Sequence, residues 1–387
     1  MRRDGRPITE PAVDRILSTQ AILNQEHMLV SWAEQRTQQA ARCSRRMVLP
    51  KGLDAGQIEV ARALAQGGDL QLVIGPAGSG KTTALTAAAF NLGLQGCTVF
   101  GVAPTAAAAE VLATETGMKA DTLDKLLVEH SLTDRAPRPE YDLPPRSTVI
   151  VDEAGTASTP NLAALAQLAD QKDWRIVMVG DSRQFSSVGR GGMFAHLVNQ
   201  HGATELEQVH RFRHEWERHA SLHLRDGNPQ ALAEYDRRGR LHGGTASEME
   251  TEIIDAWAAA RAKGDTVALM ANSNQSGNRL NRLAQMTRFM IGKISIQNGR
   301  LRLGDEVICV GDEVVTRRND RTLRTDRGAW SRTASIGPSK RSIPTGRSPS
   351  PAHPAPFTHR PTTWRTICGS ATPKPATPPK AAPSTPP

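Results

Sequence analysis

The stretch Leu70–Thr83, LQLVIGPAGSGKTT, decides the fold class of this chain. It begins with a short apolar run, LQLVI, of the kind that forms a buried parallel strand. The next residues read GPAGSGKT, and a run of good helix formers follows from Thr83 to Leu92. This order of strand, loop and helix is the context of a phosphate-binding loop. The alternative is a glycine-rich turn before an ordinary helix, and the flanking pattern disfavours it.

Each residue type in the loop suits a phosphate ligand. The glycines let backbone N–H groups close around phosphate oxygens, and the N-terminus of the following helix adds positive potential. Lys81 can reach β- and γ-phosphates, and the Thr82 hydroxyl can ligate Mg²⁺. The predicted nucleotide-binding residues are therefore those of the loop: Gly75, Pro76, Ala77, Gly78, Ser79, Gly80, Lys81, Thr82 and Thr83.

Length and composition bound the other possibilities. The 387 residues suggest two or three domains, and an apolar fraction of 38% is enough for real cores. No stretch has the apolar length of a membrane span, and the N-terminus lacks the apolar segment of a secretory signal. The cysteines are few and lack metal-ligand spacing, so we expect reduced thiols in a cytoplasmic protein.

The net charge of +9 comes mostly from one end of the chain. Residues 331–387 contain eight Lys or Arg and no Asp or Glu, which leaves 40 basic and 39 acidic groups elsewhere. A nucleic-acid partner must therefore be argued from local features and not from the overall charge.

Residues 52–204 alternate strand and helix signals, as in an α/β domain with a parallel sheet. One helix is marked by Thr159 as N-cap with Pro160 at its first position. Chemistry in such a sheet lies beyond the carboxyl ends of the strands. The expected strands are Leu70–Ile74, Thr98–Ala103, Thr148–Val151 and Arg175–Val179.

Polar residues follow three of these strands. Asp152 and Glu153 suit a Walker B site, in which Asp152 holds Mg²⁺ and Glu153 orients and deprotonates the attacking water. A solvated strand end is the alternative. Gln184 could hydrogen-bond the γ-phosphate or the water, although the turn alone leaves an ordinary turn equally open. By itself, Pro104-Thr105 indicates only a helix start with Thr105 as N-cap.

The segments GPAGSGKTT, APTAAAAEVL, VIVDEAG, VGDSRQFSSV and LEQVHRF occur in the order and spacing of superfamily 1 helicase motifs I, Ia, II, III and IV. Over about residues 15–330 the chain resembles the RecD-like, 5′-to-3′ branch, and within it the helicase part of conjugative relaxase-helicases. The resemblance implies a DNA helicase that uses ATP and Mg²⁺ and binds single-stranded DNA. It also implies other conjugation or DNA-processing proteins as further partners.

The same resemblance implies roles for further residues. Gln57 would recognise adenine, and Arg211 would contact the γ-phosphate. Pro104, Thr105 and Phe185 would line the single-strand track, although Phe185 stands where the family usually has Leu. With these additions the predicted catalytic residues are Lys81, Asp152, Glu153, Gln184 and Arg211, and the predicted metal ligands are Thr82 and Asp152.

The expected domain order is an N-terminal helical segment, a complete RecA-like ATPase domain, an incomplete second RecA-like domain and a disordered tail. In the second domain we expect helices at 212–225, 249–262 and 276–288 and a strand at 266–270. Short antiparallel strands at 299–317 resemble the small β insertion of the family. The boundaries are 1–51, 52–204, 205–330 and 331–387, and the last range is rich in Pro and Arg.

Helicase motifs V and VI and the relaxase residues are missing from the sequence, which predicts a chain truncated at both ends. A remnant that binds nucleotide and DNA but moves nothing is therefore the competing hypothesis. A metabolic P-loop kinase is disfavoured because it would not need the Gly180–Gln184 motif or Arg211.

Overall fold

The computed structural model describes residues 18–37, 47–184, 187, 190–303, 306–316, 320–324, 330–331, 336–338, 364–366 and 369–370. Contacts divide the chain into two compact units, residues 1–240 and 241–387. The segment 205–240, which the sequence analysis assigned to a second domain, belongs by its contacts to the first unit.

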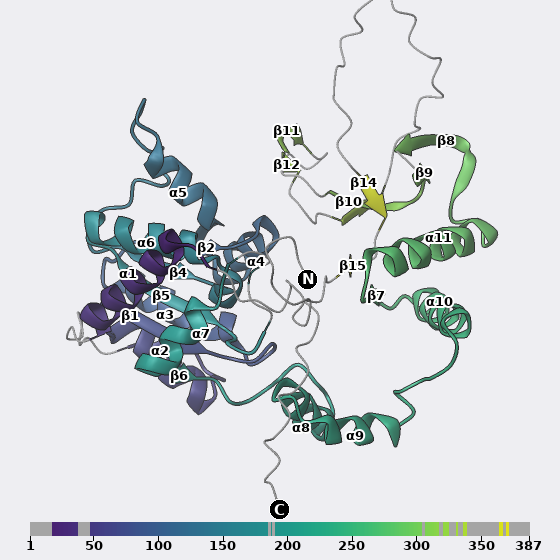
Figure 1. Cartoon of the computed structure of the whole chain (residues 1–387), viewed down its shortest axis with the longest axis horizontal. Helices are drawn as coiled ribbons and strands as arrows, with labels where there is room; N and C mark the ends of the chain where they lie inside the picture. The colour runs from purple at the N-terminus through teal and green to yellow at the C-terminus, as the bar shows by residue number, and fades with distance from the viewer. Residues whose placement is uncertain are drawn as a thin grey trace, which may run out of the picture. The chain divides into compact units, whose positions relative to one another are not determined.

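The first unit is built on a six-stranded sheet with the order β3-β2-β4-β5-β1-β6 (Figure 1). Every neighbouring pair of strands is parallel, which confirms the predicted α/β class. The strands are β1 Leu70–Ile74, β2 Val99–Ala103, β3 Lys119–Thr122, β4 Thr148–Val151, β5 Arg175–Gly180 and β6 Thr204–Glu205. Four of them match the predicted strands to within one residue. β3 and β6 were missed because β3 has no apolar run and β6 is two residues long.

Helices α1 to α7 cover both faces of this sheet, and α8 and α9 follow them in the first unit. Their bounds are α1 Gln20–Thr37, α2 Ala55–Gln66, α3 Lys81–Leu94, α4 Ala106–Thr116, α5 Leu123–Ser131, α6 Thr159–Lys172, α7 Met193–His201, α8 Glu215–Arg225 and α9 Leu232–Asp236. The N-cap of α6 is Ser158, whose hydroxyl accepts from the backbone N–H of Asn161, and not Thr159 as predicted. Thr159 is instead buried within the first turn.

Two apolar clusters lie on opposite faces of the sheet. Along β1, for example, Leu72 and Ile74 belong to one cluster and Val73 to the other, as the alternation of a strand requires. Helices α1, α5, α6 and α7 pack in the first cluster, and α2, α3 and α4 pack in the second. The sheet is therefore buried on both faces, and its strand ends are left to carry polar chemistry.

Helix α1 is an integral part of the first unit. Leu29 is fully buried, and Trp32 donates from its indole nitrogen to Asp170 on α6 at 3.0 Å. Arg36 donates to the same carboxylate at 2.7 Å and to the carbonyl of Trp174 at 2.6 Å. These contacts join apolar burial with a charge-assisted hydrogen bond, so α1 is firmly tied to α6.

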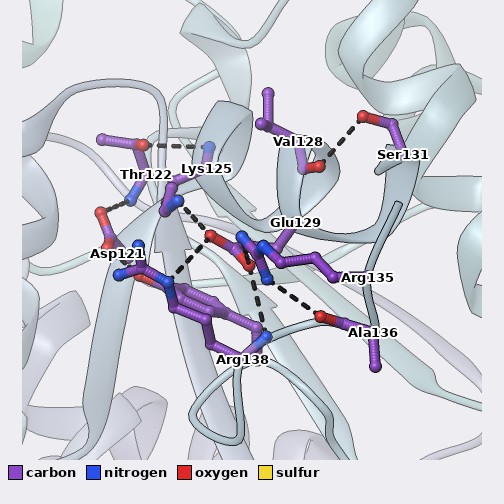
Figure 2. Close-up of polar contacts among 10 residues, drawn as sticks. Asp121, Thr122, Lys125, Val128, Glu129, Ser131, Arg135, Ala136 and Arg138 are labelled. Atoms are coloured by element: carbon purple, nitrogen blue, oxygen red, sulfur yellow. Dashed lines mark hydrogen bonds and ion pairs between the residues drawn. The ribbon is translucent and has the colours of Figure 1, made fainter. Parts of the chain in front are cut away.

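A buried carboxylate ties α5 to the loop that follows it. Glu129 is fully buried. Its carboxylate accepts hydrogen bonds from the Lys125 ammonium group, from the Arg135 guanidinium at 2.8 Å and from the backbone N–H of Arg138 at 3.3 Å (Figure 2). The hydrogen bond from Lys125 and those from the two arginines lower the pKa of Glu129 to about 2. The cluster therefore holds the loop between α5 and β4 in place.

The second unit contains α10 Ala246–Ala262, β7 Met270–Ala271 and α11 Asn274–Met290. Its small apolar core joins Ile254, Leu269, Leu280 and Ala284. The predicted strand at 266–270 is wrong, because only Met270 and Ala271 pair, with the short β15. In the first unit, the helix predicted at 212–225 is α8, which begins later, at Glu215, with His214 as its N-cap.

Short strands complete the described part of the second unit. They are β8 Ser295–Leu303, β9 Glu306–Val310, β10 Glu313–Thr316, β11 Asp320–Arg324, β12 Trp330–Ser331, β13 Ile336–Pro338, β14 Trp364–Thr366 and β15 Gly369–Ser370. The pairing of β8 with β9 is antiparallel, as the alternation at 299–317 predicted. Three short strands fall in the range 331–387. The other residues of this range, except Ser331, lie outside the described residues, so their predicted disorder stays a prediction.

Among the helices that the structure describes, none has both the length and the apolarity to cross a membrane.

Candidate active site

The loop between β1 and α3 has a backbone that only glycine adopts easily. Gly78 and Gly80 have φ of 81° and 80°, in the left-handed region. A Cβ on Gly80 would lie 2.1 Å from Nε2 of Gln57, and one on Gly75 would lie 2.6 Å from Oγ of Ser79. The close approach of neighbouring groups explains why this loop requires glycines where the sequence has them.

A cavity of about 830 Å³ opens at this loop, within the first unit. It brings together side chains that are far apart in the sequence: Gly52, Asp54, Gln57, Ala77, Gly78, Gly80, Lys81, Thr82, Thr83, Ala108, Val111, Glu115, Asp152, Glu153, Gln184, His210 and Arg211. The five predicted catalytic residues are all in this set, as are both predicted metal ligands. Gly75, Pro76 and Ser79 belong to the loop but do not line the cavity.

Pro104 and Thr105, two of the predicted nucleic-acid residues, do not line this cavity. Thr105 is the N-cap of α4, where its hydroxyl accepts from the backbone N–H of Ala108 at 3.2 Å. Pro104 precedes it at the end of β2. Phe185 lies outside the described residues. The single-strand role of these three residues stays a prediction.

Two carbonyl groups of the loop hold the side chain of Lys81. Its ammonium group donates to the carbonyl oxygens of Gly75 at 2.8 Å and Pro76 at 3.2 Å. Burial lowers the pKa of Lys81, and the charges of Glu153 and Asp152 act in the opposite direction. The Ser79 hydroxyl is buried and has no hydrogen-bond partner among the described residues. A loop with a buried hydroxyl that lacks a partner and with an ammonium group beside it fits a polar, anionic ligand.

Asp152 and Glu153 follow β4 and line the same cavity as the loop. Oδ1 of Asp152 accepts from the backbone N–H of Glu153 at 2.9 Å. Burial raises the pKa of Asp152 to about 6, and the charges of Glu153 and Glu115 act in the same direction. Glu153 has φ of 54°, which costs a non-glycine residue on the order of 1–3 kcal/mol. The strained backbone and the perturbed carboxyl group coincide, as expected of a functional site.

The start of α2 supplies the other wall. Asp54 and Gln57 form a capping box, in which Oδ1 of Asp54 accepts from the N–H of Gln57 at 2.8 Å. Oε1 of Gln57 accepts in return from the N–H of Asp54 at 3.2 Å. The other carboxylate oxygen of Asp54 pairs with Nε2 of His210 at 2.8 Å. The backbone N–H of His210 also donates to the carbonyl of Gly78 at 2.8 Å. This hydrogen bond holds the next residue, Arg211, close to the loop.

Sequence reasoning missed six of the lining residues. Ala108, Val111 and Glu115 have the spacing of one face of α4, but nothing in the sequence said that this face borders the loop. His210 had one available signal, its position next to Arg211. Gly52 and Asp54 precede α2, and Asp54 could have been found as the N-cap of that helix.

The donor set fits Mg²⁺. Thr82 and Asp152 both line the cavity. The described part of the chain has no group of three or more His, Cys, Asp or Glu that could hold a metal ion. Mg²⁺ usually takes one or two protein ligands and completes its shell with water and substrate phosphates, so a single carboxylate and a hydroxyl suffice.

The family described as AAA domain matches residues 52–246 of the chain. Conjugal transfer protein TraA of Rhizobium radiobacter is 31% identical over 261 residues, which is 66% of this chain and 23% of that protein. The TraA proteins of Agrobacterium fabrum and, as a probable one, Sinorhizobium fredii are 29% and 28% identical, with the same coverage. The chain thus spans about a quarter of the length of these relatives. The predicted likeness to conjugative DNA-transfer proteins is confirmed.

Two solved structures show weaker likeness. Pif1 helicase from Candida albicans has a TM-score of 0.44 and 15% identity over 76% of this chain and 69% of its own. The arterivirus helicase nonstructural protein 10, in complex with DNA, has a TM-score of 0.26 and 20% identity over 43% of this chain and 41% of its own.

Proposed function

We propose that this chain, which belongs to the AAA domain family, is an ATP-hydrolysing motor. The chain binds Mg²⁺ and ATP in the cavity beside β1. It uses hydrolysis to move on single-stranded DNA in the 5′-to-3′ direction, as the helicase part of a conjugal transfer protein. The supporting observation is that Lys81, Asp152, Glu153, Gln184 and Arg211 line one cavity although four separate segments carry them.

The loop and its lysine bind the nucleotide. Backbone N–H groups from Gly78 to Thr82 surround the β-phosphate, aided by the N-terminus of α3. Lys81 exchanges its carbonyl partners for β- and γ-phosphate oxygens, which offer an opposite charge. Thr82 and Asp152 hold Mg²⁺, which neutralises phosphate charge when bound.

The opposite wall carries out hydrolysis. Glu153 accepts a proton from the attacking water, and Gln184 orients that water toward the γ-phosphate. Arg211, seated against Gly78, stabilises the charge that develops on the transferred group. Gln57 contacts the adenine side of the cavity, although its Oε1 is already used by the capping box. Nε2 of Gln57 takes no part in the capping box and can donate to the base.

Two substitutions test the ATPase function. We expect Lys81→Ala to abolish binding of a fluorescent ATP analogue with Mg²⁺, whereas Glu153→Gln keeps binding and loses single-turnover hydrolysis. The control is Lys263→Ala, which removes an exposed lysine of the second unit and should change neither property. Equal affinity of the wild type and Lys81→Ala would refute the nucleotide site. An unchanged rate in Glu153→Gln would refute the base.

The DNA function needs a separate test. ATP hydrolysis is measured with and without single-stranded DNA, beside unwinding of a duplex that carries a 5′ overhang. Similarity to conjugal transfer proteins supports DNA-stimulated hydrolysis and strand separation. Hydrolysis that DNA does not stimulate, with no strand separation, would refute the helicase function and leave a nucleotide hydrolase that does not act on DNA.

A further inference from the structure

Two pairs of opposite charges join the turn after β5 to the end of α8. Arg225 donates from Nη2 to Oδ1 of Asp181 at 2.6 Å and from Nε to Oδ2 at 3.1 Å. Arg183 in the same turn pairs with Asp226 at 3.5 Å. The Asp181 side chain is 3% exposed and that of Arg225 is 22% exposed, whereas the second pair is about half exposed. The Asp181–Arg225 pair is therefore the more buried of the two pairs, and its contact is bidentate.

Asp181 in turn organises the segment that carries Gln184 into the cavity. Oδ1 of Asp181 accepts from the backbone N–H of Arg183 at 3.0 Å, and its carbonyl accepts from the N–H of Gln184 at 3.3 Å. Burial alone would raise the pKa of Asp181, but hydrogen bonds from Arg225 and from the Arg183 backbone lower it overall. The carboxylate is therefore kept ionised by the partner on α8, and it shapes the turn in that form.

The other end of α8 is fixed to the segment that carries Arg211. Nε of Arg218 donates to the carbonyl of Phe212, the residue after Arg211, at 2.9 Å. The backbone N–H of His210, the residue before Arg211, donates to the carbonyl of Gly78 in the phosphate-binding loop. One helix of eleven residues therefore spans the two segments from which Gln184 and Arg211 reach the cavity.

We propose that Arg225 is a positioning residue for nucleotide hydrolysis. Through Asp181 it holds the turn that carries Gln184, and α8 sets the distance between this turn and the segment that carries Arg211. The inference rests on the proposed function of the cavity. Gln184 acts on the attacking water, and Arg225 does not line the cavity. Loss of Arg225 should therefore lower the rate of hydrolysis and leave nucleotide affinity nearly unchanged.

Arg225→Met keeps the length of the side chain and removes its charge and hydrogen bonds, whereas Arg225→Lys keeps the charge but not the two-pronged contact. For Arg225→Met we expect kcat to fall about 10- to 100-fold, because small misplacements of a water-orienting group have effects of this size. Arg225→Lys should recover part of that loss. The control is Arg237→Met, which breaks an exposed pair with Glu234 on α9 and should retain wild-type kinetics.

A double-mutant cycle separates this role from a general loss of structure. If Arg225 acts through Gln184, then Gln184→Ala with Arg225→Met should be no slower than Gln184→Ala alone. Additive losses, or a wild-type kcat in Arg225→Met, would overturn the inference while leaving the ATPase function intact. Should Arg225→Met fail to fold, Arg225→Lys takes its place in the cycle. A wild-type chain without hydrolysis would overturn the proposed function, and this inference with it.

Discussion

Asp152→Asn should stabilise the nucleotide-free protein and at the same time disable it. The Asp152 carboxyl has a pKa of about 6 in the folded protein, against 3.8 for an ordinary aspartate, chiefly because it is buried. A raised folded pKa means that this group favours folding while protonated. That contribution is complete below pH 3.8 and is lost as the pH rises through about 6. The asparagine side chain stays neutral and keeps an oxygen to accept from the N–H of Glu153.

The size of the effect follows from the pKa difference. Each pKa unit corresponds to about 1.4 kcal/mol, so ionised Asp152 costs about 3 kcal/mol of folding free energy at pH 8. At pH 5 the folded carboxyl is still mostly protonated, and the cost is about 1.5 kcal/mol. The gain in stability from Asp152→Asn should therefore grow by about 1.5 kcal/mol between pH 5 and pH 8.

The assay is urea unfolding without nucleotide or Mg²⁺, followed by tryptophan fluorescence. Trp32 and Trp174 are buried in the same unit as Asp152 and report its unfolding. The control is Asp134→Asn, an exposed aspartate in the loop after α5, which should change stability by less than about 0.5 kcal/mol at either pH. An equal gain at both pH values, or a loss at pH 8, would refute the reasoning. Hydrolysis should be absent in Asp152→Asn, because the metal ligand has lost its charge.

Leu29→Ala should lower the free energy of unfolding by about 2–5 kcal/mol, because this side chain of α1 is fully buried; unchanged urea unfolding would show that α1 does not support the first unit. Gly80→Ala should abolish nucleotide binding, since its Cβ would meet Gln57, whereas Gly93→Ala on α3 meets nothing and should bind normally in the same titration. If both variants bind alike, the loop geometry is wrong. Glu129→Gln should lower the thermal midpoint at pH 7, and the difference from wild type should shrink as the pH falls from 4.5 toward 2, because the carboxylate stabilises the fold only while ionised. A difference independent of pH in thermal scans would contradict this.

The sequence alone determined the features that depend on neighbouring residues. The apolar runs of β1, β4 and β5 predicted buried parallel strands because each run is contiguous and both of its faces are covered. The phosphate-binding loop could be read directly because its glycines, Lys81 and Thr82 stand in one short segment. Parallel strands also place their carboxyl ends on one edge, so Asp152 and Gln184 could be expected near the loop.

Only the tertiary structure decided which distant groups meet. Asp54 and His210 are 156 residues apart in the chain, and Asp181 and Arg225 are 44 apart, yet each pair forms a direct contact. No local pattern links such residues, because the contact depends on the sheet order and on the path of the chain through β6 to α8. The position of β3 at the edge of the sheet was hidden for the same reason. Short-range periodicity specifies elements and motifs, whereas the partners of a buried charge are chosen by packing over the whole unit.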